Sequence, residues 1–173
     1  IRNTINNKVW GLANQYNNLY FRYNLVDKMI LKSTGDAVIN TVTVGRGGTG
    51  EIATNTALGF DALNSNTTGT NNTAIGNKAL TANNIGSNNT ANGSEALFSN
   101  TSGSNNTANG RQALYSNTTG NSNTANGFRA LKSNTIGSSN TANGREALYS
   151  NTIGNNNTAN GSEALFSNTS GSN

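Results

Sequence analysis

The sequence contains no cysteine and no histidine, and it is poor in charged and aromatic residues. Without cysteine there is neither a disulfide framework nor a thiolate metal site. Cysteine content therefore does not indicate whether the protein lies in an oxidising or a reducing compartment. Without histidine or cysteine, the chain also lacks the side chains that hydrolytic enzymes most often use as base and nucleophile. We therefore expect no enzyme, no catalytic residue and no cofactor.

Long apolar runs are also missing, because no stretch approaches the roughly 20 residues that a membrane-spanning helix needs. No signal-peptide pattern is visible either. We expect no insertion into a membrane. The chain begins with Ile1 and stops at the end of a repeat, so we expect it to be a piece of a longer protein.

The formal net charge of +4 comes from 11 basic and 7 acidic residues. Residues 1–54 hold six of the bases and three of the acids, and residues 55–173 hold the other five bases and four acids. This excess is too small and too interspersed to make a nucleic-acid-binding surface. We expect no nucleic-acid partner.

Only 32% of the residues are hydrophobic, and 20 are glycine. Such a composition is typical of disordered chains, which bury too little apolar surface to offset the entropy of ordering. A disordered linker, however, needs no fixed spacing of alanine, leucine and glycine. The regular spacing described next therefore indicates an ordered structure with a thin core.

A unit of 17 residues occurs seven times between residues 55 and 173, without insertion or deletion. It reads N-T-A-x-G-x-x-A-L-x-S-N-T-x-G-x-x, and its positions are numbered in that order below. The units begin at Asn55, Asn72, Asn89, Asn106, Asn123, Asn140 and Asn157. A short fixed period indicates stacked coils that contact only their neighbours. We predict an all-β fold, a parallel β-roll or solenoid of seven coils after a short N-terminal β-rich segment.

Within each unit we predict a strand at T-A-x, a second strand at A-L-x-S and a turn at N-T-x-G. Five units carry Asn-Gly at positions 4 and 5, which is ordinarily a hairpin signal. In the first two units Leu58 and Ile75 occupy position 4 without any shift of frame. Because a β-branched residue tolerates left-handed backbone geometry poorly, the pattern favours parallel coils over hairpins.

Two variable positions support in-register stacking, which would place equivalent residues roughly 4.8 Å apart. Position 7 pairs opposite or neutral side chains on neighbouring coils, except that Glu146 would repel Glu163. Position 10 holds two adjacent aromatic pairs. The residues at position 7 are Asp61, Lys78, Glu95, Gln112, Arg129, Glu146 and Glu163, and those at position 10 are Asn64, Thr81, Phe98, Tyr115, Lys132, Tyr149 and Phe166.

Before the repeats we expect a β-rich adaptor segment at residues 1–40 and a glycine-rich joint at 41–54. Residues 19–23 are aromatic and β-prone, and 28–40 have the pattern of two short strands around a turn at 33–36. Residues 3–18 are Asn-rich, and helix or coil remain open for them. The joint includes V-G-R-G-G-T-G but no following Gly-Lys-Ser/Thr, so it lacks a phosphate-loop signature.

The regular apolar content of each unit is one leucine and two alanines. Burying a leucine stabilises by about 1.5–3 kcal/mol, whereas ordering the backbone of one unit costs on the order of 17–34 kcal/mol. Ladder hydrogen bonds and stacked Asn side chains reduce the deficit. Packing several chains together would bury a second face of every coil, so we expect an oligomer.

Three segments resemble those of phage tail fibres, and the first of them also resembles the repeats in the heads of trimeric autotransporter adhesins. They are the N-T-A-I-G at 72–76 with Ala79-Leu80, the K-M-I-L-K-S-T-G-D at 28–36, and the V-G-R-G-G-T-G at 44–50. The resemblance implies a homotrimeric left-handed parallel β-roll packed about a three-fold axis. The chain departs from the adhesin pattern in its period and in having Asn at position 4 of five units, where adhesin heads are apolar. Which columns face the core therefore stays open.

The candidate ligand-facing residues are at position 10: Phe98, Tyr115, Lys132, Tyr149 and Phe166. Exposed rings there could stack on the sugars of a surface polysaccharide; the other interpretation is that they pack between chains of the trimer. Glu146 and Glu163 resemble a carboxylate dyad only in spacing, and a solvated charged face is the preferred interpretation. The loops carry Asn, Ser and Thr in place of the Asp of calcium-binding repeats, so we predict no metal site.

These features and the resemblance together predict a structural or adhesive trimeric fibre, a phage tail fibre by preference, whose repeats form a rigid shaft or a receptor-facing surface. One alternative is a bacterial surface adhesin. Another is a glycan- or ice-binding solenoid, the latter because of the Thr column from Thr56 to Thr158. The expected partners are a cell-surface glycan or protein receptor and other fibre or baseplate proteins. The expected location is a virion tail fibre or the extracellular surface.

Overall fold

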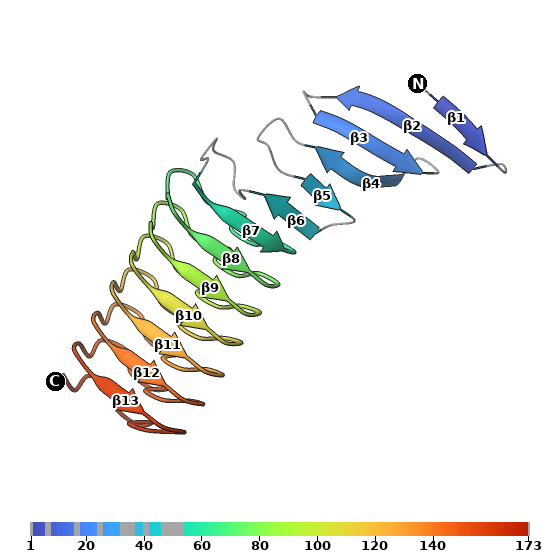
Figure 1. Ribbon diagram of the computed structural model, residues 1–173. Coiled ribbons are helices and arrows are strands. Elements are labelled where there is room, and N and C mark those ends of the chain that lie inside the picture. The colour runs from blue at the N-terminus through green and yellow to red at the C-terminus, as the bar shows by residue number, and fades with distance from the viewer. Residues whose placement is uncertain are drawn as a thin grey trace.

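The computed structural model describes residues 54–172 continuously and, before them, six strands within residues 2–45. The described residues form thirteen strands, β1 to β13, and none of them lies in a helix. All thirteen strands belong to one sheet, in which spatial order equals sequence order (Figure 1). The prediction of an all-β chain that contains a parallel solenoid is confirmed.

The first six strands form an antiparallel meander, as each strand pairs with the next along the chain. Their bounds are β1 Arg2–Ile5, β2 Lys8–Gln15, β3 Asn18–Tyr23, β4 Val26–Leu31, β5 Ala37–Ile39 and β6 Val42–Gly45. The strand expected at 19–23 lies in β3. The two strands expected within 28–40 correspond to β4 and β5, which pair Leu31 with Ala37. The turn expected at 33–36 lies outside the described residues.

Two expectations about this region were wrong. The described residues of the range 3–18 lie in strands, mainly in β1 and β2, where helix or coil was expected. Strand β2 is hydrogen-bonded on both sides, and such pairing can override weak strand propensity. Residues 42–45, which we assigned to the joint, form β6 between β5 and the first strand of the repeats. Residues 46–53 lie outside the described part of the chain. The proposed adaptor role of residues 1–40 stays a prediction.

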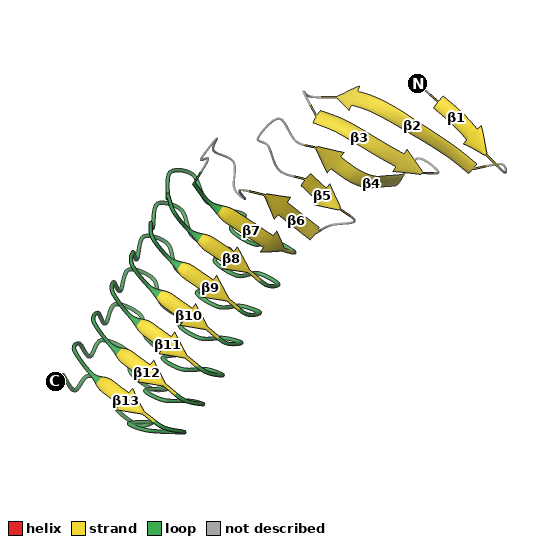
Figure 2. Ribbon diagram, viewed as in Figure 1, coloured by secondary structure: helices red, strands yellow, loops and turns green. Residues whose placement is uncertain are grey.

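The repeats contribute seven parallel strands, one from each unit (Figure 2). They are β7 Thr56–Gly59, β8 Thr73–Ile75, β9 Thr90–Asn92, β10 Thr107–Asn109, β11 Thr124–Asn126, β12 Thr141–Asn143 and β13 Thr158–Asn160. Equivalent residues pair directly, as Ala108 does with Ala125. The strand predicted at T-A-x and the parallel in-register stacking are therefore confirmed.

The second predicted strand, at A-L-x-S, is wrong. Positions 6 to 11 form a turn in which the residues at positions 7 and 9 have left-handed backbone geometry, for example Glu95 at φ 59° and Leu97 at φ 50°. The turn still supports stacking, because the Leu97 N–H donates to the Ala113 carbonyl of the next coil at 3.0 Å. Left-handed geometry is unfavourable for leucine. Here it accompanies complete burial of the leucine side chain, which offsets that cost.

The apolar core runs along the array from positions 3, 8 and 9. Its alanines and leucines are at most 2% exposed in the first six coils. The leucine column consists of Leu63, Leu80, Leu97, Leu114, Leu131 and Leu148. Each of these six coils thus buries its regular apolar residues against neighbouring coils of the same chain.

Two columns of asparagine lie beside this core, at positions 1 and 12. Asn72 and Asn83 both donate their side-chain N–H groups to the Gly86 carbonyl, at 2.8 and 2.9 Å. The Asn72 Oδ1 accepts the backbone N–H of Asn89 at 3.0 Å, and Asn83 also donates to Asn66 Oδ1 at 2.8 Å. No buried side-chain polar atom in the described part of the chain lacks a partner. The inward polar columns are thus positions 1 and 12, whereas the Asn at position 4 is exposed or half-buried.

The glycines at positions 15 and 5 are required by close contacts between coils. A Cβ on Gly103, at position 15, would lie 2.4 Å from Asn100 Oδ1 and 2.4 Å from the Gly120 carbonyl oxygen. Gly93, at position 5, has a φ of +141° and faces the backbone of Gly110. Since real Cβ atoms do not approach that closely, both positions fix how near one coil can lie to the next.

Candidate functional site

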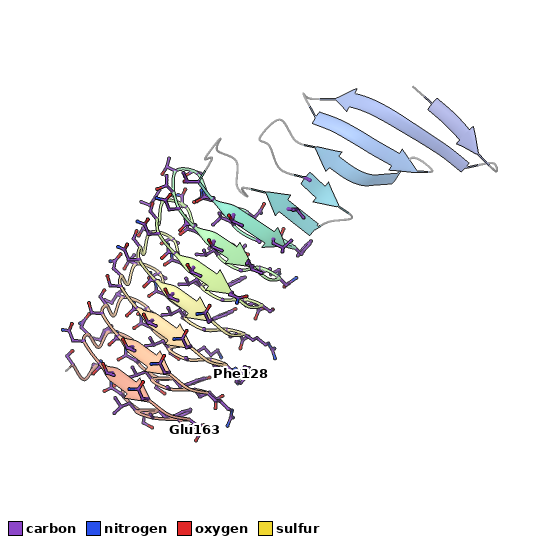
Figure 3. All side chains as sticks on the ribbon, viewed as in Figure 1. Phe128 and Glu163 are labelled. Carbon is purple, nitrogen blue, oxygen red and sulfur yellow. The ribbon has the colours of Figure 1, made fainter. Side chains whose placement is uncertain are left out.

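Every charged and every aromatic residue of the repeat array falls at unit position 6, 7 or 10. These positions lie on the turn that follows each strand, and we call their side chains the variable ridge. Figure 3 shows two of its members, Phe128 and Glu163, at the edge of the array beyond the ends of the strands. Position 6 holds Phe60, Asn77, Ser94, Arg111, Phe128, Arg145 and Ser162. The charged and aromatic side chains of the array are therefore confined to one edge.

The five candidate residues at position 10 form a single column. Phe98 stacks on Tyr115 with ring centroids 5.1 Å apart and planes 4° apart, and Tyr149 stacks on Phe166 at 5.0 Å and 6°. Lys132 lies between the two pairs; its Nζ is 5.4 Å from the Tyr149 ring centroid and donates to the Tyr149 hydroxyl at 3.3 Å. The structure brings together all five residues that the sequence singled out.

This stacking bears on how the column could bind a ligand. Parallel rings along the axis cover one another's faces, so the column offers mainly ring edges and the two Tyr hydroxyls. Stacking of a sugar on an aromatic side chain needs a free ring face. A ligand-facing role for these residues stays a prediction.

Position 7 carries a linear network of hydrogen bonds and ion pairs. Gln112 donates to Glu95 at 2.8 Å and accepts from Arg129 Nε at 3.0 Å, and Arg129 lies 3.6 Å from Glu146. The network joins four successive coils. Glu146 is the most buried acid, with a side chain that is 10% exposed.

The expected repulsion between Glu146 and Glu163 was wrong. Arg145, at position 6, contacts Glu146 Oε2 at 2.9 Å and Glu163 Oε1 at 3.0 Å. The two carboxylates therefore share one guanidinium, as in a charged surface network and unlike a free acid pair. Sequence reasoning missed this contact because it compared position 7 only with itself, although position 6 lies one residue away.

A third cluster surrounds Phe128, which is half-buried. The guanidinium carbon of Arg129 lies 4.7 Å from its ring centroid, and that of Arg111 lies 5.9 Å away. Such cation–π contacts contribute about 0.5–1 kcal/mol at exposed sites. The ridge over coils four to six thus combines basic and aromatic groups.

In the described part of the chain, no group of three His, Cys, Asp or Glu side chains is placed to hold a metal ion. The same residues include no helix that is long and apolar enough to cross a membrane. The ridge presents charged groups, aromatic rings and hydroxyl groups.

The comparisons with known proteins supply no function. No family model matches this chain, and neither a curated protein nor a solved structure matches it. Function must therefore be argued from the coil itself.

Proposed function

We propose that this chain is part of a homotrimeric fibre with a structural role, in which the repeat array acts as a rigid shaft or a receptor-facing surface. The observation that carries the proposal is uninterrupted in-register stacking of identical coils, with every buried side-chain polar atom of the described residues satisfied. Each added coil extends such an array by roughly 4.8 Å. Because every unit has the same length, the coils stack regularly into a long, stiff array. Such an array suits a spacer that must hold two parts of a fibre at a fixed distance.

Two features favour a structural role over catalysis. The charged and aromatic residues of the array are confined to the ridge, and the carboxylates that come closest to a dyad, Glu146 and Glu163, both contact Arg145. A retaining or inverting glycosidase pair needs one carboxyl group free to donate a proton and the other free to attack or to activate water. The ion pairs of both carboxylates with Arg145 instead stabilise the surface of the array.

A host-attachment appendage such as a phage tail fibre is the setting that we propose, on the resemblance of the repeat and of the two preceding segments. A bacterial surface adhesin is the alternative within the same architecture. In either setting the protein lies on a virion or outside a cell. A glycan or protein receptor and other fibre or baseplate proteins are then the partners.

The test is the mass of the folded particle in solution, measured by light scattering across a dilution series. We expect a trimer whose mass does not change with concentration, together with an elongated profile in small-angle X-ray scattering. A folded monomer would overturn the proposal. It would leave a self-sufficient solenoid, for which glycan or ice binding would be the leading function.

A further inference from the structure

The outer face of the parallel strands differs from the ridge in carrying no charge. Position 3 of each strand points into the core, so positions 2 and 4 point outward. Position 2 is threonine in all seven coils, and position 4 is Leu58, then Ile75, then asparagine. We call this surface the strand face.

The threonine at position 2 makes no side-chain hydrogen bond among the described residues of the repeats. Threonines at position 13 donate to the next coil, as Thr101 does to the Thr118 carbonyl at 3.1 Å. Within residues 54–172, by contrast, no side-chain hydrogen bond involves a position-2 hydroxyl, and these residues are exposed or half-buried. Exposure by itself does not explain why position 2 is always threonine. Positions 6, 7, 10 and 14 are exposed to a similar degree, and their residue types differ from coil to coil.

A strip of apolar side chains lies at the N-terminal end of the same face. Val44 of β6 pairs with Leu58 of β7, and Leu58 pairs with Ile75 of β8. Their exposed fractions are 40%, 44% and 38%. Three adjacent apolar side chains directed outward from neighbouring strands are a surface that a partner could cover.

The other outer surfaces are less suited to contact with copies of the same chain. In an in-register trimer, the side chains directed at the three-fold axis meet their own equivalents from the other two chains, whereas contacts farther from the axis join different residues. On the ridge, Lys132 would face two lysines and Arg111 two arginines, without a compensating change of sign. On the surface at positions 13 to 16, many of the hydrogen-bonding groups are already in use. The Thr hydroxyls at position 13 and the side-chain oxygens at position 16 bond to the neighbouring coil.

From this placement, the geometry points to the strand face as the surface through which chains of this protein associate, with the variable ridge directed away from the axis. The inference rests on the proposed homotrimer and names its interface. The Thr hydroxyls of this face can hydrogen-bond to their own equivalents, whereas the Asn side chains of coils four to seven already bond one another along the column. The face carries no charge that would repel a second copy of itself. The ridge, left outside, is then the surface open to a receptor.

Single-cysteine variants test the inference, because the chain has no cysteine of its own. Three substitutions in coil five place one thiol on each outer surface: Thr124→Cys on the strand face, Lys132→Cys on the ridge and Ile136→Cys at position 14. Each variant is oxidised as the assembled protein with copper phenanthroline and run on a non-reducing gel. We expect disulfide-linked dimers of chains for Thr124→Cys and unlinked chains for the other two.

Charge insertion gives a second readout that does not depend on disulfide geometry. Thr124→Lys should convert the trimer to monomers in light scattering, while Gln112→Lys, which adds the same charge to the ridge, should leave it trimeric. Circular dichroism verifies that each variant is folded. Should Thr124→Lys fail to fold, the cross-linking result decides alone.

Cross-linking at Lys132→Cys or Ile136→Cys, without any at Thr124→Cys, would overturn the inference and leave the trimer intact. A wild-type protein that is a folded monomer would overturn the proposed function itself, and the interface with it. A monomer that also stops ice growth in a thermal-hysteresis assay would assign the Thr column to ordered water instead of a second chain.

Discussion

Seven copies of one unit allow the inside of the coil to be compared with its variable ridge, residue by residue. Inside, positions 1, 3, 5, 8, 9, 12 and 15 hold the same residue type in every coil, and each has a contact that explains it. On the ridge, positions 6, 7 and 10 range over acids, bases, rings and small polar groups. The difference shows that residues which make the contacts between coils are held constant, whereas the ridge is free to vary.

The largest effect in this comparison should come from Gly103→Ala. The added Cβ would lie 2.4 Å from the backbone carbonyl oxygen of Gly120 and from the buried Asn100 Oδ1, which Asn117 holds by a hydrogen bond, so neither neighbour can easily move away. We expect a loss of about 4 kcal/mol or more in the free energy of unfolding, measured by urea denaturation at fixed protein concentration. Ser102→Ala, one residue away and half-buried, is the control and should change stability by less than about 0.5 kcal/mol.

The next largest effect should follow Leu114→Ala, which removes a fully buried side chain and leaves a cavity between two coils. Such changes cost about 2–5 kcal/mol. Ile136→Ala removes a side chain of equal size that is 54% exposed, and it should cost much less. Equal losses for the two variants would contradict the assignment of position 9 to the core.

A smaller loss is expected for Asn117→Leu. The substitution keeps the volume but removes the donor to Gly120 at 3.0 Å and to Asn100 Oδ1 at 2.8 Å, and so leaves buried acceptors with fewer partners. We expect about 1–3 kcal/mol from the same denaturation experiment. Asn92→Ser alters an exposed asparagine outside the core and should be nearly neutral. A stable Asn117→Leu protein would mean that the inward amides are dispensable.

The smallest effect is expected on the ridge, from Glu146→Gln. This substitution removes the charge that contacts Arg129 and Arg145, whose side chains are 33% and 58% exposed. Because both arginines are partly exposed although Glu146 is not, we expect these pairs to contribute up to about 1 kcal/mol and to be screened by salt. We therefore expect the difference from the wild type to shrink as the salt concentration of the denaturation series is raised. A difference that persists at high salt would point to a packing role for Glu146.

Part of the fold and of the candidate site could be read from local pattern. Leu58 and Ile75 at a position that elsewhere holds asparagine indicated parallel coils, and the spacing of Phe98, Tyr115, Tyr149 and Phe166 indicated stacked rings. Both inferences need only the period and the fixed distance between parallel strands. Arg145 was missed because its contacts cross from one unit position to another, which a column-by-column comparison does not include.

The sequence by itself determined the period, the in-register stacking and the leucine column, since these follow from spacing along the chain. Only the tertiary structure decided that Asn at positions 1 and 12 points inward, that the A-L segment is a turn and that residues 3–18 include strands. Burial of an amide is favourable only where partners meet it. Those partners, the carbonyl of Gly86 and the amide of Asn66 for Asn83, come from a turn and a neighbouring coil that are brought together by folding.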